Sequence, residues 1–219
     1  MNHAISRASI SPNASWLMTL TFVILSLAIP HSAQSAVIYS GVQNIAIPTT
    51  FDGVYLDIDT ATTSTSVITG WDINPFFGGY AIGNSAAFQP VRSGTGNSDS
   101  ILNLAYGTLV DSLLNYAVGE AGSSDHIGGG AYQFTEGAQG YLGFKFTTNS
   151  NSGPFYGWMR LTLTANTSGA VIHDWAYDDT GAGIFIGSIT SVPEPSRALL
   201  VMVGLASTLL RRHRQMIAK

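Results

Sequence analysis

The segment from residue 140 to residue 165 constrains the fold more tightly than any other part of the chain. Between residues 140 and 148, Leu142, Phe144 and Phe146 alternate with polar or small residues, and residues 155–165 repeat this pattern. The six residues between the two runs (NSNSGP) are typical of a turn. Because successive strand residues point to opposite faces of a sheet, the two runs predict a pair of antiparallel strands with one buried face.

In the second run, Met159, Leu161 and Leu163 are expected to face the core, whereas Trp158 and Arg160 are expected to face outward. The apolar spacing of residues 101–116 would also suit a helix, but a glycine within them argues against one. About ten short strands without intervening helices predict an all-β fold, an antiparallel β-sandwich of jelly-roll-like type. Beyond the two runs, strands are predicted within residues 53–59, 66–73, 171–177 and 183–189.

Residues 1–35 have the organisation of a secretory signal peptide. Arg7 supplies positive charge, residues 16–29 form an apolar run, and a proline follows it. The small residues Ala33 and Ser35 then indicate cleavage before Ala36. Since the apolar run is short for a membrane span, we expect signal peptidase to remove it rather than leave an anchor. The chain is therefore expected to be exported, with residues 36–190 as its folded domain.

The C-terminal segment, residues 191–219, has three parts in a fixed order. Residues 198–210 carry no charge and predict a short transmembrane helix. At ~1.5 Å per residue this helix would span about 20 Å, less than the ~30 Å hydrocarbon core of a bilayer. The basic residues after it are expected to stay in the cytoplasm. The first part is the motif Val192, Pro193, Glu194, Pro195 and Ser196, and the last part contains Arg211, Arg212 and Arg214.

This order of proline motif, short apolar helix and arginine-rich end resembles the PEP-CTERM sorting signal. The resemblance covers about 28 residues, from Val192 onward, although the tail is slightly long for such a signal. It implies that an exosortase, a membrane-bound cysteine protease, recognises and cleaves the chain. Members of this family typically come from Gram-negative bacteria that make exopolysaccharide. The resemblance thus implies transient passage through the inner membrane and a final place in the cell envelope, at the surface or outside the cell.

The charge distribution argues against nucleic-acid binding. Residues 36–190 contain only three cations, Arg92, Lys145 and Arg160, against twelve acids, which gives a formal charge of −9. Such an acidic domain cannot release the counterions that drive binding to DNA or RNA. The chain also has no cysteine, so the exported domain must rely on its core rather than on disulfides.

The sequence contains no convincing catalytic arrangement. Between residues 36 and 190 only His126 and His173 are histidines, too few and too far apart for a zinc site. A triad of Ser85, His173 and Asp174 is conceivable, but the residues around the serine lack the nucleophile-elbow pattern. His173 and Asp174 are also neighbours on a predicted strand and would point to opposite faces. We therefore expect a protein that is not an enzyme.

Aspartates offer a better candidate site, for calcium. Asp57 and Asp59 lie two residues apart on a predicted strand and are expected to share a face. Carboxylates together with loop carbonyls are the hard oxygen ligands that Ca²⁺ takes. Asp52 and the acidic turn at residues 178–179 provide further oxygens. The alternative is that these aspartates only favour turns and solubilise an outer face.

Exposed aromatic residues suggest a second candidate site, for glycans. Trp158, sharing its predicted face with Arg160, could stack on a sugar ring, or it could belong to the core or stack on the arginine. Two functional interpretations follow. The first is an exported, exosortase-sorted protein with a structural or adhesive role in the envelope or matrix. The second is a secreted protein that binds or degrades polysaccharide, including exopolysaccharide.

Overall fold

The computed structural model describes residues 37–117 and 124–190. All of them belong to one compact unit that spans residues 34–194. The predicted signal peptide, the sorting motif at Val192–Ser196, the helix at 198–210 and the basic residues after it lie outside the described residues. Within the described residues, no helix has the length and apolar character needed to cross a membrane.

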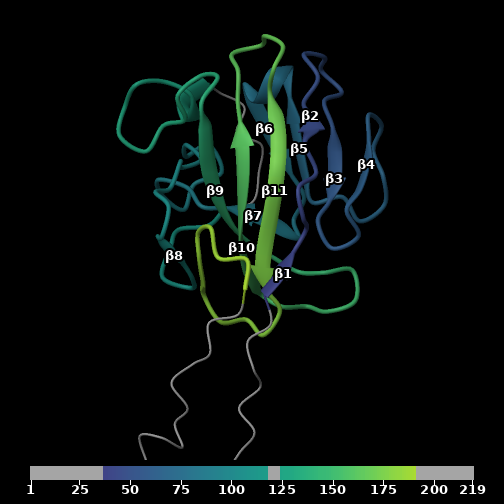
Figure 1. Cartoon of the computed structure of the whole chain (residues 1–219), viewed down its shortest axis with the longest axis vertical. Coiled ribbons are helices and arrows are strands. Elements are labelled where there is room, and N and C mark those ends of the chain that lie inside the picture. Colours follow the sequence, from purple (N-terminus) through teal and green to yellow (C-terminus); the bar gives the residue numbers. More distant parts are fainter. Residues whose placement is uncertain (1–36, 118–123, 191–219) are drawn as a thin grey trace, which may run out of the picture. The chain divides into compact units, whose positions relative to one another are not determined.

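The described chain folds almost entirely into β-strands, which confirms the predicted all-β class (Figure 1). Its two helical elements are single 3-10 turns, η1 (Phe77–Gly79) and η2 (Ser124–His126). The strands are β1 (Val37–Tyr39), β2 (Ile45–Ala46), β3 (Tyr55–Asp57), β4 (Thr62–Ser64), β5 (Ile73–Phe76), β6 (Ala81–Asn84), β7 (Phe88–Pro90), β8 (Leu109–Val110), β9 (Gln139–Phe146), β10 (Phe155–Thr162), β11 (Val171–Asp178) and β12 (Ile184–Phe185).

Two larger sheets and one small sheet contain these strands, and every pairing between named strands is antiparallel. The larger sheet has the order β1-β11-β10-β9-β7, with β2 also paired to β11. The second sheet has the order β4-β3-β5-β6, and β12 pairs with β8. Figure 1 shows β9, β10 and β11 side by side as the longest strands. Their central hairpin pairs Phe155 with Phe146, so residues 147–154 form the loop that the sequence predicted around NSNSGP.

One hydrophobic core contains residues of both larger sheets. Leu56, Ile73 and Ile82 from the second sheet pack in the same cluster as residues of β9, β10 and β11. The predicted inward facing of the central hairpin is confirmed, since each of these side chains is at most 1% exposed: Leu142, Phe144, Phe146, Met159, Leu161 and Leu163. The core therefore depends on the strands whose alternation was clearest.

The outer face of β10 differs from the prediction, because it is covered. Trp158 is only 2% exposed and belongs to a second hydrophobic cluster with Val110 and Ile184 of the small sheet. Its indole N–H donates to the carbonyl oxygen of Ser188 at 3.1 Å. Residues 91–116, which follow β7, and the segment at β12 supply this cover. The expectation that Trp158 faces solvent was wrong, because an alternating strand with apolar residues on both faces is buried on both.

One predicted strand is absent, and the ambiguous stretch at residues 101–116 is not helical, as the glycine within it suggested. Residues 66–73 form a turn rather than a strand, and only Ile73 begins β5. Gly70 has a φ of 79°, a left-handed conformation that interrupts a strand. Residues 101–116 contain no helix and only the short strand β8.

Candidate metal centre

Three aspartates meet at one end of the second sheet. Asp57 is the last residue of β3, Asp59 lies in the turn that follows, and Asp72 directly precedes β5. One carboxylate oxygen of each lies within 4.8 Å of the others. The structure thus brings together the two predicted ligands, Asp57 and Asp59, and adds a third.

Backbone groups of the second sheet fix two of these carboxylates. The turn from β3 to β4 closes because Asp57 Oδ1 accepts a hydrogen bond from the N–H of Thr60 at 3.1 Å. Asp72 is held by its backbone, whose N–H donates to the carbonyl of Leu56 at 2.8 Å. Its Oδ2 accepts the N–H of Ile58 at 2.8 Å. The carboxylates of Asp57, at the end of β3, and Asp72, just before β5, are thus each held by a backbone N–H.

A residue of the larger sheet closes the cluster. Asn149, in the loop between β9 and β10, donates its side-chain N–H₂ to Asp57 Oδ2 at 2.9 Å and to Asp59 Oδ1 at 3.2 Å. Its backbone N–H donates to Asp59 Oδ2 at 3.0 Å. A Cβ at Gly70 would lie 2.6 Å from the Asn149 amide oxygen, so this glycine leaves the room that Asn149 needs. A second link is the indole N–H of Trp175, which donates to the Ile58 carbonyl at 3.2 Å.

The electrostatics of the cluster are unfavourable without a cation. Asp57 is 3% exposed and Asp72 is 2% exposed, and no Lys or Arg appears among the described contacts of the three carboxylates. Buried carboxylates are normally paired with a cation or bound to a metal.

The pKa values of the three groups reflect this crowding. Burial, with added repulsion from the other two carboxylates, raises the pKa of Asp72 to about 7. Burial and the hydrogen bond to Asp57 raise the pKa of Asp59. Burial also opposes ionisation of Asp57, but hydrogen bonds from Asp59, Thr60 and Asn149 outweigh it, and the pKa of Asp57 lies below its usual value. Ionisation of all three carboxylates together is therefore disfavoured, and a bound cation would offset this repulsion.

The donor set fits a hard divalent cation. Three carboxylates supply oxygens of the type that Ca²⁺ prefers, and the Asn149 amide would add a fourth oxygen if its side chain rotated by half a turn. Asp52 and the turn at residues 178–179 do not join the cluster by any described hydrogen bond. Asp178 Oδ1 instead accepts hydrogen bonds from Thr180 and Ala182 in its own turn.

The sequence could have indicated only part of this site. The spacing of Asp57 and Asp59 is a local signal, whereas Asp72 was placed inside a predicted strand and Asn149 inside a hairpin loop. Their approach depends on which strands pair and on how the two sheets meet, and no local pattern encodes that.

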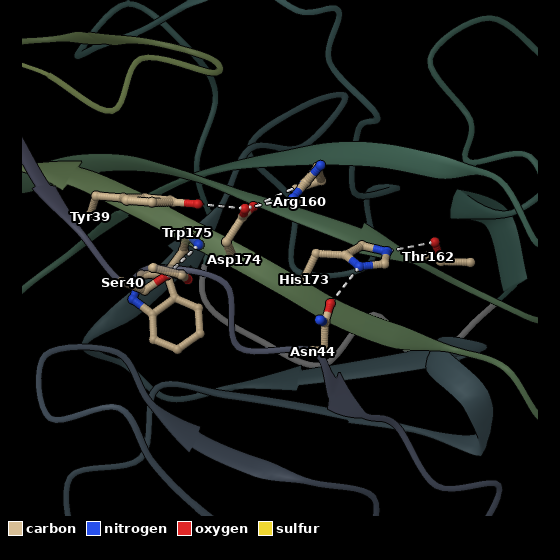
Figure 2. A network of polar contacts seen from close by, with 9 residues as sticks. Tyr39, Ser40, Asn44, Arg160, Thr162, His173, Asp174 and Trp175 are labelled. Carbon is tan, nitrogen blue, oxygen red and sulfur yellow. Dashed lines mark hydrogen bonds and ion pairs between the residues drawn. The ribbon is translucent and has the colours of Figure 1, made fainter.

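The predicted glycan pair, Trp158 and Arg160, is occupied by other contacts. Arg160 forms a two-point ion pair with Asp174, with Nη2 to Oδ2 at 2.7 Å and Nε to Oδ1 at 3.0 Å. Figure 2 shows this pair together with Tyr39, whose hydroxyl donates to Asp174 Oδ2 at 2.9 Å. The hydrogen bond to Asp174 raises the pKa of Arg160. With Trp158 buried and Arg160 paired, the pair does not form the exposed platform that was expected.

The neighbouring residue, His173, departs from its expected geometry. The pairing of β10 with β11 shifts between Arg160 and Leu161, so that His173 is an extra residue in a β-bulge. Its ring nitrogens contact Thr162 Oγ1 at 3.0 Å and Asn44 Oδ1 at 3.2 Å. Asp174 and His173 thus contact Arg160 and Thr162, which lie two residues apart on β10 and share a face. Figure 2 draws these as two separate groups of contacts that lie near each other.

The bulge does not create the conceivable triad with Ser85. Both ring nitrogens of His173 already have other partners, Thr162 and Asn44. Ser85 instead follows β6, where its N–H donates to the Asp72 carbonyl at 2.8 Å and its buried hydroxyl has no hydrogen-bond partner among the described residues. The two residues therefore have separate structural surroundings.

No protein-family model, curated protein or solved structure matches this chain.

Proposed function

We propose that this chain is an exported, exosortase-sorted protein of the PEP-CTERM type whose domain at residues 36–190 has a structural or adhesive role in the cell envelope or extracellular matrix. In this proposal Asp57, Asp59 and Asp72 bind one Ca²⁺, and the domain is an antiparallel sandwich that the ion stabilises. The signal peptide and the C-terminal segment support export and sorting. The single observation that carries the structural role is the three-carboxylate cluster that Asn149 closes from the other sheet.

The position of the cluster favours a stabilising role over a catalytic one. The second sheet contributes all three carboxylates, and the larger sheet contributes Asn149 and the Trp175 indole. An ion held there would neutralise buried charge and fix the turn after β3 under the β9–β10 loop. A glycosidase needs two carboxylates that flank a bond in an open cleft, whereas Asp57 and Asp72 are almost fully buried. The arrangement therefore supports calcium as a structural ion of an exported domain.

Thermal unfolding of the exported chain in calcium and in excess chelator tests this proposal. A ligand bound only by the folded state at 100 times its Kd adds about 2.7 kcal/mol to the free energy of unfolding. For a domain of this size we expect the Tm to rise by about 5–10 °C, since each kcal/mol is worth about 2–4 °C.

Asp72→Asn provides the decisive variant. An asparagine oxygen can still accept the Ile58 N–H, so the fold should persist and the chelated Tm should stay level or rise, while the response to calcium disappears. Asp111→Asn is the matched control, because Asp111 also accepts a backbone N–H, from Leu113 at 2.8 Å, but lies outside the cluster. An equal Tm of the parent chain in calcium and in chelator would refute the calcium site.

A further inference from the structure

The turn between β5 and β6 has an unusual backbone. Its three residues Phe77, Gly78 and Gly79 have positive φ values of 53°, 68° and 85°. Glycine adopts this conformation freely, but for a bulky residue such as Phe77 it is a genuine outlier. Such strain persists only where the surrounding structure enforces it, and it gathers at functional positions.

Neighbouring segments do enforce this conformation. The N–H groups of Phe77 and Gly78 donate to the carbonyls of Thr50 and Pro48 at 3.1 and 2.9 Å. A Cβ at Gly78 would lie 2.3 Å from Thr164 Oγ1, so no other residue fits there. The three carbonyls of the turn are also engaged: that of Phe77 accepts the N–H of Asn166 at 3.1 Å, that of Gly78 accepts the N–H of Thr164 at 2.8 Å, and that of Gly79 contacts Nε2 of His126 at 2.9 Å.

The result is a rigid aromatic surface beside a small hollow. Phe77, Tyr80 and Asn166 line the hollow, which has a volume of about 260 Å³. Tyr80 is 37% exposed, and the ring of Phe51, which is 73% exposed, lies 5.9 Å from that of Phe77. Asn166 is itself in a left-handed conformation, with a φ of 62°. A strained phenylalanine and a left-handed asparagine thus present an aromatic ring and an amide at one place, and none of the described residues that line it is charged.

We propose that this hollow binds one sugar unit of a neutral hexose polysaccharide. The flat C–H face of a pyranose would stack on the Phe77 ring, and the Asn166 amide would hydrogen-bond to its hydroxyls, in the usual combination of apolar lining and a few polar groups. The volume is below the ~300–1,000 Å³ of pockets that enclose a whole ligand, so the rest of the polymer would lie in solvent. A lining without charge favours a neutral polymer over a charged one. The hollow lies at the end of β5 opposite to Asp72, so this binding is independent of the cation.

Electrophoresis of the full chain through native gels that contain a polysaccharide tests the proposal. Separate gels contain a soluble glucan, a galactan or a mannan, and one further gel contains dextran sulfate as a charged polymer. Every gel contains a detergent whose headgroup carries no sugar. Phe77→Gly is the best variant, because it removes the ring and relieves the backbone strain. Tyr132→Gly is its matched control, since Tyr132 is also left-handed, with a φ of 64°, and is 66% exposed in another loop.

We expect at least one neutral polymer to retard the parent chain and Tyr132→Gly. Phe77→Gly and Tyr80→Ala should bind about tenfold more weakly, a change that corresponds to about 1.4 kcal/mol, and Phe77→Gly should melt at or above the parent Tm. Three results would each overturn the proposal. They are no retardation of the parent chain by any neutral polymer, retardation by dextran sulfate alone, and equal losses in Phe77→Gly and Tyr132→Gly.

Discussion

At the scale of single residues, what distinguishes this domain is how its few charges are placed. Among the described residues, Arg160 forms an ion pair with Asp174. Asp57, Asp59 and Asp72 instead lie close together, and their hydrogen-bond partners are an amide and backbone N–H groups. The sequence predicted Asp57 and Asp59 as a pair because they are near in the chain. It could not predict Asp72, Asn149 or the Arg160–Asp174 pair, since each depends on strand register.

His173 should make stability depend on pH. Burial, together with the nearby positive charge of Arg160, lowers the pKa of His173 below its usual 6.5, although the Asp174 charge acts in the opposite direction. The folded state therefore binds this proton less tightly than the unfolded state does. The neutral imidazole contributes fully to the free energy of unfolding above pH 6.5, and this contribution is lost as the pH falls below that value.

The test compares the parent chain with His173→Gln between pH 7.5 and pH 5. We expect the Tm of the parent to fall further over this range than that of the variant, by only a few degrees because solvent reaches the imidazole. Parallel curves for the two proteins would show that His173 does not titrate in this way.

At the scale of elements, the strength of the local alternation decided what could be predicted. β9, β10 and β11 lie within a few residues of their predicted bounds. In β9 and β10 the alternation of buried Phe, Met and Leu permits only one facing of the strand. The prediction of a strand at residues 66–73 was wrong, because the apolar residues before Ile73 lie in a turn around Gly70. The burial of Trp158 could not be predicted either, because the segments that cover it have little regular secondary structure.

Leu161 provides the test of strand facing. It is fully buried in β10, so Leu161→Asp would place an unpaired charge in the core and should abolish folding, given a total stability of about 5–15 kcal/mol. Leu161→Ala should fold but lose about 2–5 kcal/mol in the free energy of unfolding.

Leu113→Asp is the matched control, because this leucine is 87% exposed and the same change there should be tolerated. Circular dichroism and denaturant unfolding report both outcomes. A folded Leu161→Asp chain with parent-like stability would mean that the facing of β10 is reversed.

At the scale of the whole molecule, an acidic β domain lies between two terminal segments that are predicted to direct export and sorting. The all-β class follows from the sequence and is confirmed, whereas sorting remains a prediction from residues 192–219. Replacing Pro193, Glu194 and Pro195 with alanine should leave a longer, membrane-held precursor, because the protease would lose its recognition segment. Immunoblots of membrane and released fractions measure this. Normal maturation of the variant would refute the sorting proposal but would not bear on the calcium proposal.

The most direct test of the central claim is a calorimetric titration of calcium into the purified protein at pH 8, above the raised pKa of Asp72 of about 7. The account predicts one calcium ion per chain for the parent and for Asp111→Asn, and no measurable binding for Asp72→Asn. Absence of binding to the parent chain, or equal binding to Asp72→Asn, would contradict it.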